Sequence, residues 1–144
     1  MKMFKKTLSI ILAVIMLLGC TSVMAFASED DVTVSLRIEG ITECLYYGDV
    51  TVESGATALD VIKTADANDD SLSVVAVDSE YGAYIVSING ITAGTYTTMM
   101  WDGWSFMVDD VAPSVGVSAF VVADGNEIVM YYGDPFNTGM QYPI

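Results

Sequence analysis

The chain has 144 residues, with 5 basic and 19 acidic side chains, a formal net charge of −14 and no histidine. This acidity argues against nucleic-acid binding and against a basic patch for anionic lipid headgroups, because both need Lys and Arg contacts. Without histidine the chain lacks the commonest general base and the commonest zinc ligand. We therefore expect a protein that is not an enzyme and requires no metal or cofactor.

Residues 1–27 have the three-part pattern of a secretory signal peptide. Three lysines stand near the start, an apolar run covers residues 8–18, and Ala25-Phe26-Ala27 offers a small-x-small cleavage site before Ser28. The apolar run is about half of the roughly 20 residues that a transmembrane helix needs, so we expect no membrane span. The pattern predicts a mature chain of residues 28–144, secreted or at the cell surface.

Cys20 leaves a second form of export open. The segment Leu17-Leu18-Gly19-Cys20 also resembles a bacterial lipobox, in which the cysteine is lipidated and becomes the first mature residue. Cleavage before Ser28 would give a diffusing protein, and cleavage before Cys20 a tethered one. Neither form has a disulfide framework, because Cys44 is the cysteine that remains available, so the fold must rest on packing alone.

The first elements of the mature chain are two strands and a helix. Residues 32–38 alternate apolar and polar side chains, which predicts a half-buried strand, and a second strand is expected at about 44–52. The period then changes to that of a helix at about 57–66, where Thr57 is a candidate N-cap with Asp60 three residues on.

A polar stretch ends this helix and contains the opening spacing of a calcium loop. Asp66, Asn68 and Asp70 stand at the first, third and fifth ligand positions of an EF-hand. The sixth position is Ser71 in place of glycine, and the twelfth is Val77 in place of a bidentate glutamate. We interpret the stretch as a polar loop that ends the helix, with a calcium requirement left open.

The rest of the chain reads as strands joined by turns. Strands are expected at 72–77, 84–88, about 99–108, 118–122 and 127–132. Asn89-Gly90 predicts a two-residue hairpin, and Asp124-Gly125 predicts a turn between the last two strands. The order predicts an α+β domain with one helix packed on a mainly antiparallel sheet, its core at about 31–132 and an irregular tail at 133–144.

Aromatic side chains gather in two segments, Tyr81–Tyr84 and Met99–Met107. Aromatic residues of a small β domain usually belong to the core, which is what we expect of Trp104 and Phe106. Trp101 precedes Asp102-Gly103 like a loop-tip residue, so it is either a core residue or part of a binding platform together with Met100.

Catalysis finds little support in the remaining side chains. Asp102, Asp109 and Asp110 look like turn and strand-end positions, and none sits in an arrangement that implies a raised pKa. Cys44 would need a histidine or a cationic neighbour to form a nucleophilic thiolate. We therefore expect no catalytic residues.

Four motifs in order resemble the transcobalamin-like C-terminal domain family, over about residues 31–132. They are Glu53-Ser54-Gly55-Ala56-Thr57-Ala58-Leu59-Asp60-Val61-Ile62, Tyr81-Gly82-Ala83-Tyr84-Ile85-Val86-Ser87-Ile88-Asn89-Gly90-Ile91, Trp104-Ser105-Phe106 and Asp124-Gly125-Asn126-Glu127-Ile128. The resemblance implies a β-grasp-like fold of the soluble-ligand-binding kind. In the carriers of this family the domain closes over one face of cobalamin, and a large helical domain, with no counterpart in these 144 residues, covers the other.

The resemblance implies ligand contacts from Tyr81, Gly82, Ala83 and Tyr84 and from the segment with Trp104 and Phe106. Together with the loop tip, the candidate ligand-binding residues are Tyr81, Gly82, Ala83, Tyr84, Met100, Trp101, Trp104 and Phe106. Binding would be by shape and apolar contact, without a cobalt ligand from the protein.

Two functions follow as hypotheses. The first is an exported, non-enzymatic module that binds a corrinoid such as cobalamin, or another apolar-faced small molecule, with a second copy or a partner replacing the missing half of the clamp. The alternative is a cell-surface adhesion or scaffold module that contacts protein or glycan. The first predicts that Tyr81 or Trp101 is exposed beside a concave surface, and the second predicts a flat or fully packed aromatic region.

Overall fold

The computed structural model describes residues 30–96 and 100–134. The predicted signal peptide, Cys20, Met99 and residues 135–144 of the predicted tail lie outside the described residues, whereas Gly133, predicted as the start of that tail, belongs to a strand. No helix within the described residues is both long enough and apolar enough to cross a membrane.

The larger sheet has four strands in the order β2-β1-β7-β6. Its members are β1 (Asp31–Glu39), β2 (Cys44–Glu53), β6 (Gly103–Val108) and β7 (Glu127–Gly133). Strand β1 pairs antiparallel with β2 and parallel with β7, and β7 pairs antiparallel with β6. The two ends of the described chain therefore meet at the centre of this sheet.

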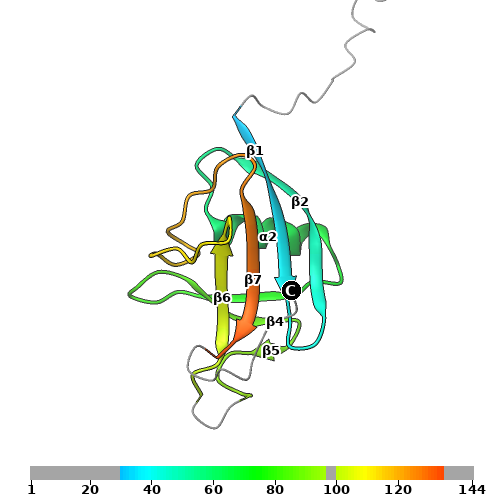
Figure 1. The fold of residues 1–144 in the computed structure, drawn as a ribbon, viewed down its shortest axis with the longest axis vertical. Coiled ribbons are helices and arrows are strands. Elements are labelled where there is room, and N and C mark those ends of the chain that lie inside the picture. Colours follow the sequence, from blue (N-terminus) through cyan, green and yellow to red (C-terminus); the bar gives the residue numbers. More distant parts are fainter. Residues whose placement is uncertain (1–29, 97–99, 135–144) are drawn as a thin grey trace, which may run out of the picture.

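A helix and a smaller sheet cover one face of the larger sheet. Figure 1 shows helix α2 (Ala58–Asn68) and strand β4 (Tyr84–Ile88) running across the strands of the larger sheet. The smaller sheet has the order β3-β4-β5, with β3 at Val74–Val77 and β5 at Ile91–Thr92. This is the predicted α+β class with one helix on mainly antiparallel strands, and the prediction is confirmed. The division of the strands into two sheets was not predicted.

The core lies between these two layers. Leu36 and Ile38 of β1, Ile128 of β7 and Ile62 of α2 are each fully buried in one cluster. The alternation of β1 explains this burial, since every second side chain points at the helix. Each such aliphatic side chain contributes roughly 1.5–3 kcal/mol by leaving water.

Helix α2 begins where the capping pattern places it. The Thr57 side chain accepts a hydrogen bond from the backbone N–H of Asp60, and the Asp60 carboxylate accepts one from the backbone N–H of Thr57. Two more N–H groups of the first turn, of Ala58 and Leu59, donate to the carbonyls of Phe120 and Val117. The start is thus satisfied both locally and by a distant segment.

We expect Thr57→Ala to lower the free energy of unfolding by about 1 kcal/mol, because the cap and one half of the capping box are lost. The bonds from Thr57 hold the pKa of Asp60 below its usual range. The carboxylate's stabilising contribution is therefore present above its ordinary pKa near 4 and is lost as the pH falls through the lowered folded-state value. Urea denaturation at about pH 7 and about pH 3 measures both effects. An equal loss at the two pH values would contradict the capping box.

Two predicted boundaries differ from the structure, at the end of the helix and at the start of the strand after it. The helix continues past residue 66 to Asn68, so Asp66 and Asn68 are helical and do not form an open calcium loop. The Asp66 carboxylate accepts a hydrogen bond from the backbone N–H of Val74, 3.1 Å away. The next strand begins at Val74 and not at residue 72, because the N–H of Leu72 donates to Asp69 in a turn.

The predicted strand at 118–122 is wrong. Its apolar alternation is real, since Phe120 and Val122 face the core and Val121 is exposed, but the backbone is a turn in which the N–H groups of Ala119 and Phe120 donate to Gly116. Residue 121 makes only an isolated bridge to Thr57. The segment's carbonyls serve the start of α2, so they are not available for a strand ladder.

The predicted strand at about 99–108 is shorter in the structure, where β6 begins at Gly103. Met100 has a positive φ of 58°, which no strand allows. The carbonyl of Asp102 accepts a hydrogen bond from the N–H of Gly94 and closes a loop. Residues 100–102 therefore belong to this loop.

The predicted hairpin at Asn89-Gly90 is confirmed. Both residues have positive φ, 48° and 79°, and join β4 to β5. The turn at Asp124-Gly125 is also present, with Gly125 at a φ of 82°, but it precedes β7 without a strand before it. Its Asp124 carboxylate accepts from the N–H of Thr33, which fixes the turn to β1.

Candidate functional site

An apolar pocket of about 460 Å³ opens at the end of the larger sheet that the helix does not cover. Helix α2 packs mainly on β1, β2 and β3, whereas the inner face of β6 is contacted by β4. The pocket is lined by Ser79, Tyr81, Gly82, Ala83, Tyr84, Ile85, Trp104, Phe106, Gly116, Val117 and Met130. Six of the eight candidate ligand-binding residues therefore surround one concave surface.

Two aromatic side chains of β6 form the wall of this pocket. Trp104 and Phe106 are two residues apart, so they share the inner face of the strand, and both are half-buried. The Trp104 Nε1 donates to the carbonyl of Ile91 at 2.9 Å, and its ring meets Tyr132 edge-on with centroids 5.3 Å apart. Phe106 packs edge-on against Phe120. Both rings pack against the core, as expected, and both also line the pocket.

The loop that carries Tyr81 forms the rim. The Ser79 hydroxyl donates to the carbonyl of Gly82 and accepts from the N–H of Tyr81, and the N–H of Gly82 donates to the carbonyl of Ser79. Gly82 has a φ of 100°, and a Cβ there would lie 2.6 Å from the Ser118 Oγ. The loop is thus held in one conformation. Tyr81 at its tip is 92% exposed, and Tyr84 next to it is 50% exposed.

Met100 and Trp101 do not line the pocket. They are 70% and 61% exposed on the loop before β6, so Trp101 is not a core residue. Tyr96, on the same loop, is 52% exposed. The structure therefore separates the two candidates at the loop tip from the six that meet around the pocket.

A buried carboxylate holds the loop that carries this tip. Asp102 is 3% exposed, and its Oδ2 accepts hydrogen bonds from the backbone N–H of Tyr96 at 2.9 Å and from the Tyr132 hydroxyl. Tyr132 lies between Tyr96 and Trp104 and makes edge-on contacts with both rings. Burial, and then the Asp102 carboxylate, raises the pKa of Tyr132. Asp102 stands directly before β6, consistent with the predicted strand-end position, but its burial was not predicted.

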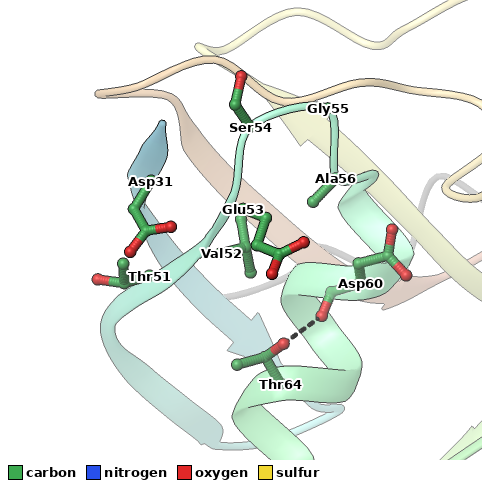
Figure 2. Close-up of a pocket in the computed structure, with 9 residues that line it drawn as sticks. All are labelled: Asp31, Thr51, Val52, Glu53, Ser54, Gly55, Ala56, Asp60 and Thr64. Atoms are coloured by element: carbon green, nitrogen blue, oxygen red, sulfur yellow. Dashed lines mark hydrogen bonds between the residues drawn. The ribbon is translucent and has the colours of Figure 1, made fainter. Parts of the chain in front are cut away.

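A second hollow of about 740 Å³ is polar. It lies between the start of β1, the end of β2 and the exposed side of α2 (Figure 2). Its acidic members are Asp31, Glu53 and Asp60, and hydroxyls come from Thr51, Ser54 and Thr64. The Asp60 carboxylate accepts hydrogen bonds in the helix cap. The backbone carbonyl of Asp60 accepts a hydrogen bond from the Thr64 hydroxyl (Figure 2). No three His, Cys, Asp or Glu residues in the described chain are grouped so as to hold a metal ion.

The one cysteine that the structure describes is not activated. Cys44 is exposed at the start of β2, and its thiol donates to the carbonyl of Tyr46. Partial burial, followed by the negative charge of Glu39, raises the pKa of the Cys44 thiol. A raised pKa leaves little thiolate near neutral pH.

Sequence reasoning missed several members of the pocket. Ile85, Gly116, Val117 and Met130 line it, although their apolar character is that of ordinary core residues. Ser79 offered a weak signal, since serine near the start of a loop favours a side-chain-to-backbone turn. Only the packing of β4, β6 and β7 brings these positions to one surface.

The comparisons place this fold among known proteins. A family model described as a domain of unknown function (DUF4430) matches residues 55–134. The crystal structure of haptocorrin in complex with Cbi is similar with a TM-score of 0.65 and 23% identity, over 80% of this chain and 28% of that chain. A putative metal binding protein from Ruminococcus gnavus ATCC 29149 is similar with a TM-score of 0.53 and 12% identity, over 73% of this chain and 99% of that one.

No curated protein sequence matches the chain significantly. At these identities the likeness to the solved structures establishes a related fold, as the transcobalamin-like resemblance implied. The chain spans 28% of the haptocorrin chain.

Proposed function

The chain belongs to the DUF4430 family, and we propose that it is an exported, non-enzymatic module that binds an apolar-faced small molecule in the pocket beside Tyr81. A corrinoid is the ligand class that we propose first. The observation that carries the proposal is the 92% exposure of Tyr81 on a fixed loop at the rim of an apolar pocket.

The Tyr81 ring does not stabilise the fold, because it is not buried. A tyrosine ring gains stability by leaving water, and this one stays in water while its loop is held by three hydrogen bonds and a positive φ at Gly82. A rigid aromatic side chain at a rim costs little entropy when a ligand covers it, which is why tyrosine is common at binding surfaces. Recognition of a flat apolar face is the use that this arrangement supports.

The pocket suits partial insertion of a ligand. Its volume of about 460 Å³ falls within the range of about 300–1,000 Å³ that is usual for small-molecule sites. A corrin ring is too broad to be enclosed, so one face or one edge would rest on Tyr81, Tyr84 and Trp104. The crystal structure of haptocorrin in complex with Cbi is a precedent for a ligand bound to a protein with a related fold.

One-sided contact limits the affinity of this module alone. A ligand that leaves one face in water forgoes much of its buried area, and binding must still offset the loss of translational and rotational freedom. We therefore expect dissociation constants in about the micromolar range, which correspond to roughly −8 kcal/mol. A second copy or a partner that covers the far face would tighten binding.

Tyr81→Ala should weaken binding of cobinamide or cobalamin by roughly 10-fold, the equivalent of about 1.4 kcal/mol. Titration of residues 28–144 with each corrinoid, followed by tryptophan fluorescence and corrinoid absorbance, measures the dissociation constant. Tyr47→Ala is the matched control, because Tyr47 is also exposed, at 74%, but stands on β2 away from the pocket. No saturable change at high micromolar ligand would overturn the corrinoid assignment, and equal effects of the two variants would overturn the site.

The scaffold alternative stays a prediction. Met100 and Trp101 favour this alternative, because they are exposed and do not line the pocket. The proposed ligand site gives them no role. Export after loss of residues 1–27, with or without lipidation of Cys20, is likewise part of the proposal.

A further inference from the structure

Two acidic residues flank the lining positions of the Tyr81 loop, and neither basic residue of the described chain lines the pocket. Asp78 and Glu80 are exposed and alternate along the chain with Ser79 and Tyr81, which both line the pocket. The Cα atom of each is therefore about 3.8 Å from the Cα atom of a lining residue. Any ligand that rests on Tyr81 comes within the field of both.

The basic residues of the described chain are remote from this rim. They are Arg37 and Lys63. Arg37 pairs in register with Val129, whereas the neighbouring Met130 lines the pocket, so Arg37 lies on the opposite face of the sheet. There its Nε is 2.5 Å from the Glu39 carboxylate. Lys63 stands on the exposed side of α2, which contributes no residue to the pocket.

Three hydrogen-bond donors of the loop are engaged within the loop and are not offered to an anion. The N–H groups of Tyr81 and Gly82 and the hydroxyl of Ser79 all donate within the loop itself. On the far wall, the Trp104 Nε1 donates to Ile91. Carboxylate or phosphate groups are bound by charged side chains or by free backbone N–H groups, and these positions offer neither.

The aromatic rings at the rim favour the opposite charge. The faces of tyrosine and tryptophan rings carry negative potential and attract cations within about 6 Å of the ring centroid. Tyr81 and Tyr84 present exposed rings, and Trp104 is half-buried behind them. The combination of aromatic faces and flanking carboxylates suits a positively charged, flat ligand.

We propose that this pocket discriminates by charge: it accepts neutral and positively charged apolar-faced ligands, prefers the positive ones, and rejects anions through Asp78 and Glu80. This inference rests on the proposed function, since it concerns the same pocket. It adds the chemical class of the ligand surface that the pocket accepts, namely a flat cation or a neutral ring that presents no carboxylate or phosphate group to the rim.

Three acridines with one ring system test the preference: N-methylacridinium as the cation, acridine as the neutral compound and acridine-9-carboxylate as the anion. Titration of residues 28–144 at about pH 8, where acridine is uncharged, is followed by fluorescence. In about 0.01 M salt we expect the cation to bind roughly 10-fold or more tightly than the anion, with the neutral ring between them. The difference should shrink at about 1 M salt, where the Debye length falls from about 30 Å to about 3 Å.

A matched pair of double variants separates the rim from the net charge of the whole chain. D78N/E80Q removes two charges at the rim, and E43Q/D49N removes two at exposed positions of the β1–β2 hairpin. We expect D78N/E80Q to abolish most of the difference between cation and anion while leaving neutral acridine unchanged. E43Q/D49N should retain that difference.

Two kinds of failure are distinguishable. If the two double variants behave alike, or if the anion binds as tightly as the cation, the charge discrimination is overturned while the pocket remains. If neither acridine nor N-methylacridinium binds, or if Tyr81→Ala leaves the binding of neutral acridine unchanged, the pocket itself fails and the charge discrimination fails with it.

Discussion

Asp102→Ala should lower the free energy of unfolding by about 2–3 kcal/mol, the largest loss that we expect from a single polar side chain of this protein. The variant leaves the partly buried N–H of Tyr96 without its 2.9 Å acceptor and removes the carboxylate partner of the Tyr132 hydroxyl. Hydrogen bonds to a charged group contribute about 1.5–3 kcal/mol, and the carboxylate's own desolvation offsets part of that sum.

The melting temperature is the direct measurement. A loss of this size corresponds to a decrease of roughly 10 °C or more for a domain of about 100 residues. Asp49→Ala is the control, because Asp49 is exposed on β2 and its removal should change stability by less than about 0.5 kcal/mol. Asp102→Asn, which keeps an acceptor oxygen, should lose less than Asp102→Ala. Equal stability of Asp102→Ala and Asp49→Ala would show that the buried carboxylate does not hold the loop.

Gly82→Ala should lower the free energy of unfolding by about 2 kcal/mol and displace the rim of the pocket. The backbone has a φ of 100°, where a side chain costs roughly 1–2 kcal/mol, and the new Cβ would lie 2.6 Å from the Ser118 Oγ. One of the two groups has to move. Because Tyr81 precedes Gly82, we expect a weaker complex with the pocket ligand as well as a lower melting temperature.

The glycines of the chain provide the control for this variant. Gly55 has a similar φ of 92°, but a Cβ there would meet no atom within 4 Å. Gly55→Ala therefore measures the conformational cost alone, and the additional loss in Gly82→Ala measures the clash with Ser118. The double variant Gly82→Ala with Ser118→Ala should recover that additional loss. Equal losses at the two glycines would show that the loop does not pack against Ser118 as described.

Local patterns in the sequence were sufficient for the elements that depend on near neighbours. The alternation at residues 32–38 predicted β1, the Thr57 and Asp60 spacing predicted the start of α2, and Asn89-Gly90 predicted the β4–β5 turn. In each case a pattern that spans only a few residues marks the element, although β1 pairs with strands elsewhere in the chain. These patterns and the motif order also indicated the fold class.

Residues whose partners are distant in sequence were the ones misread. Phe120 and Val122 alternate with exposed neighbours like strand residues, but the carbonyls of Phe120 and Val117 serve the start of α2 about 60 residues earlier in the chain. Asp102 precedes a glycine like a turn residue, yet its carboxylate is buried against Tyr132, 30 residues away. A residue's own neighbours cannot reveal such a partner.

The sequence by itself determined the acidity of the chain, the absence of histidine, the α+β order and the aromatic segments from which a ligand site could be built. Only the tertiary structure decided which aromatic residues share a surface. Helix α2 is too short and too far toward β2 to cover β6, so Trp104 and Phe106 remain open to the Tyr81 loop, while Trp101 lies elsewhere. The position of a pocket depends on which faces remain uncovered after packing, and that is a property of the whole fold.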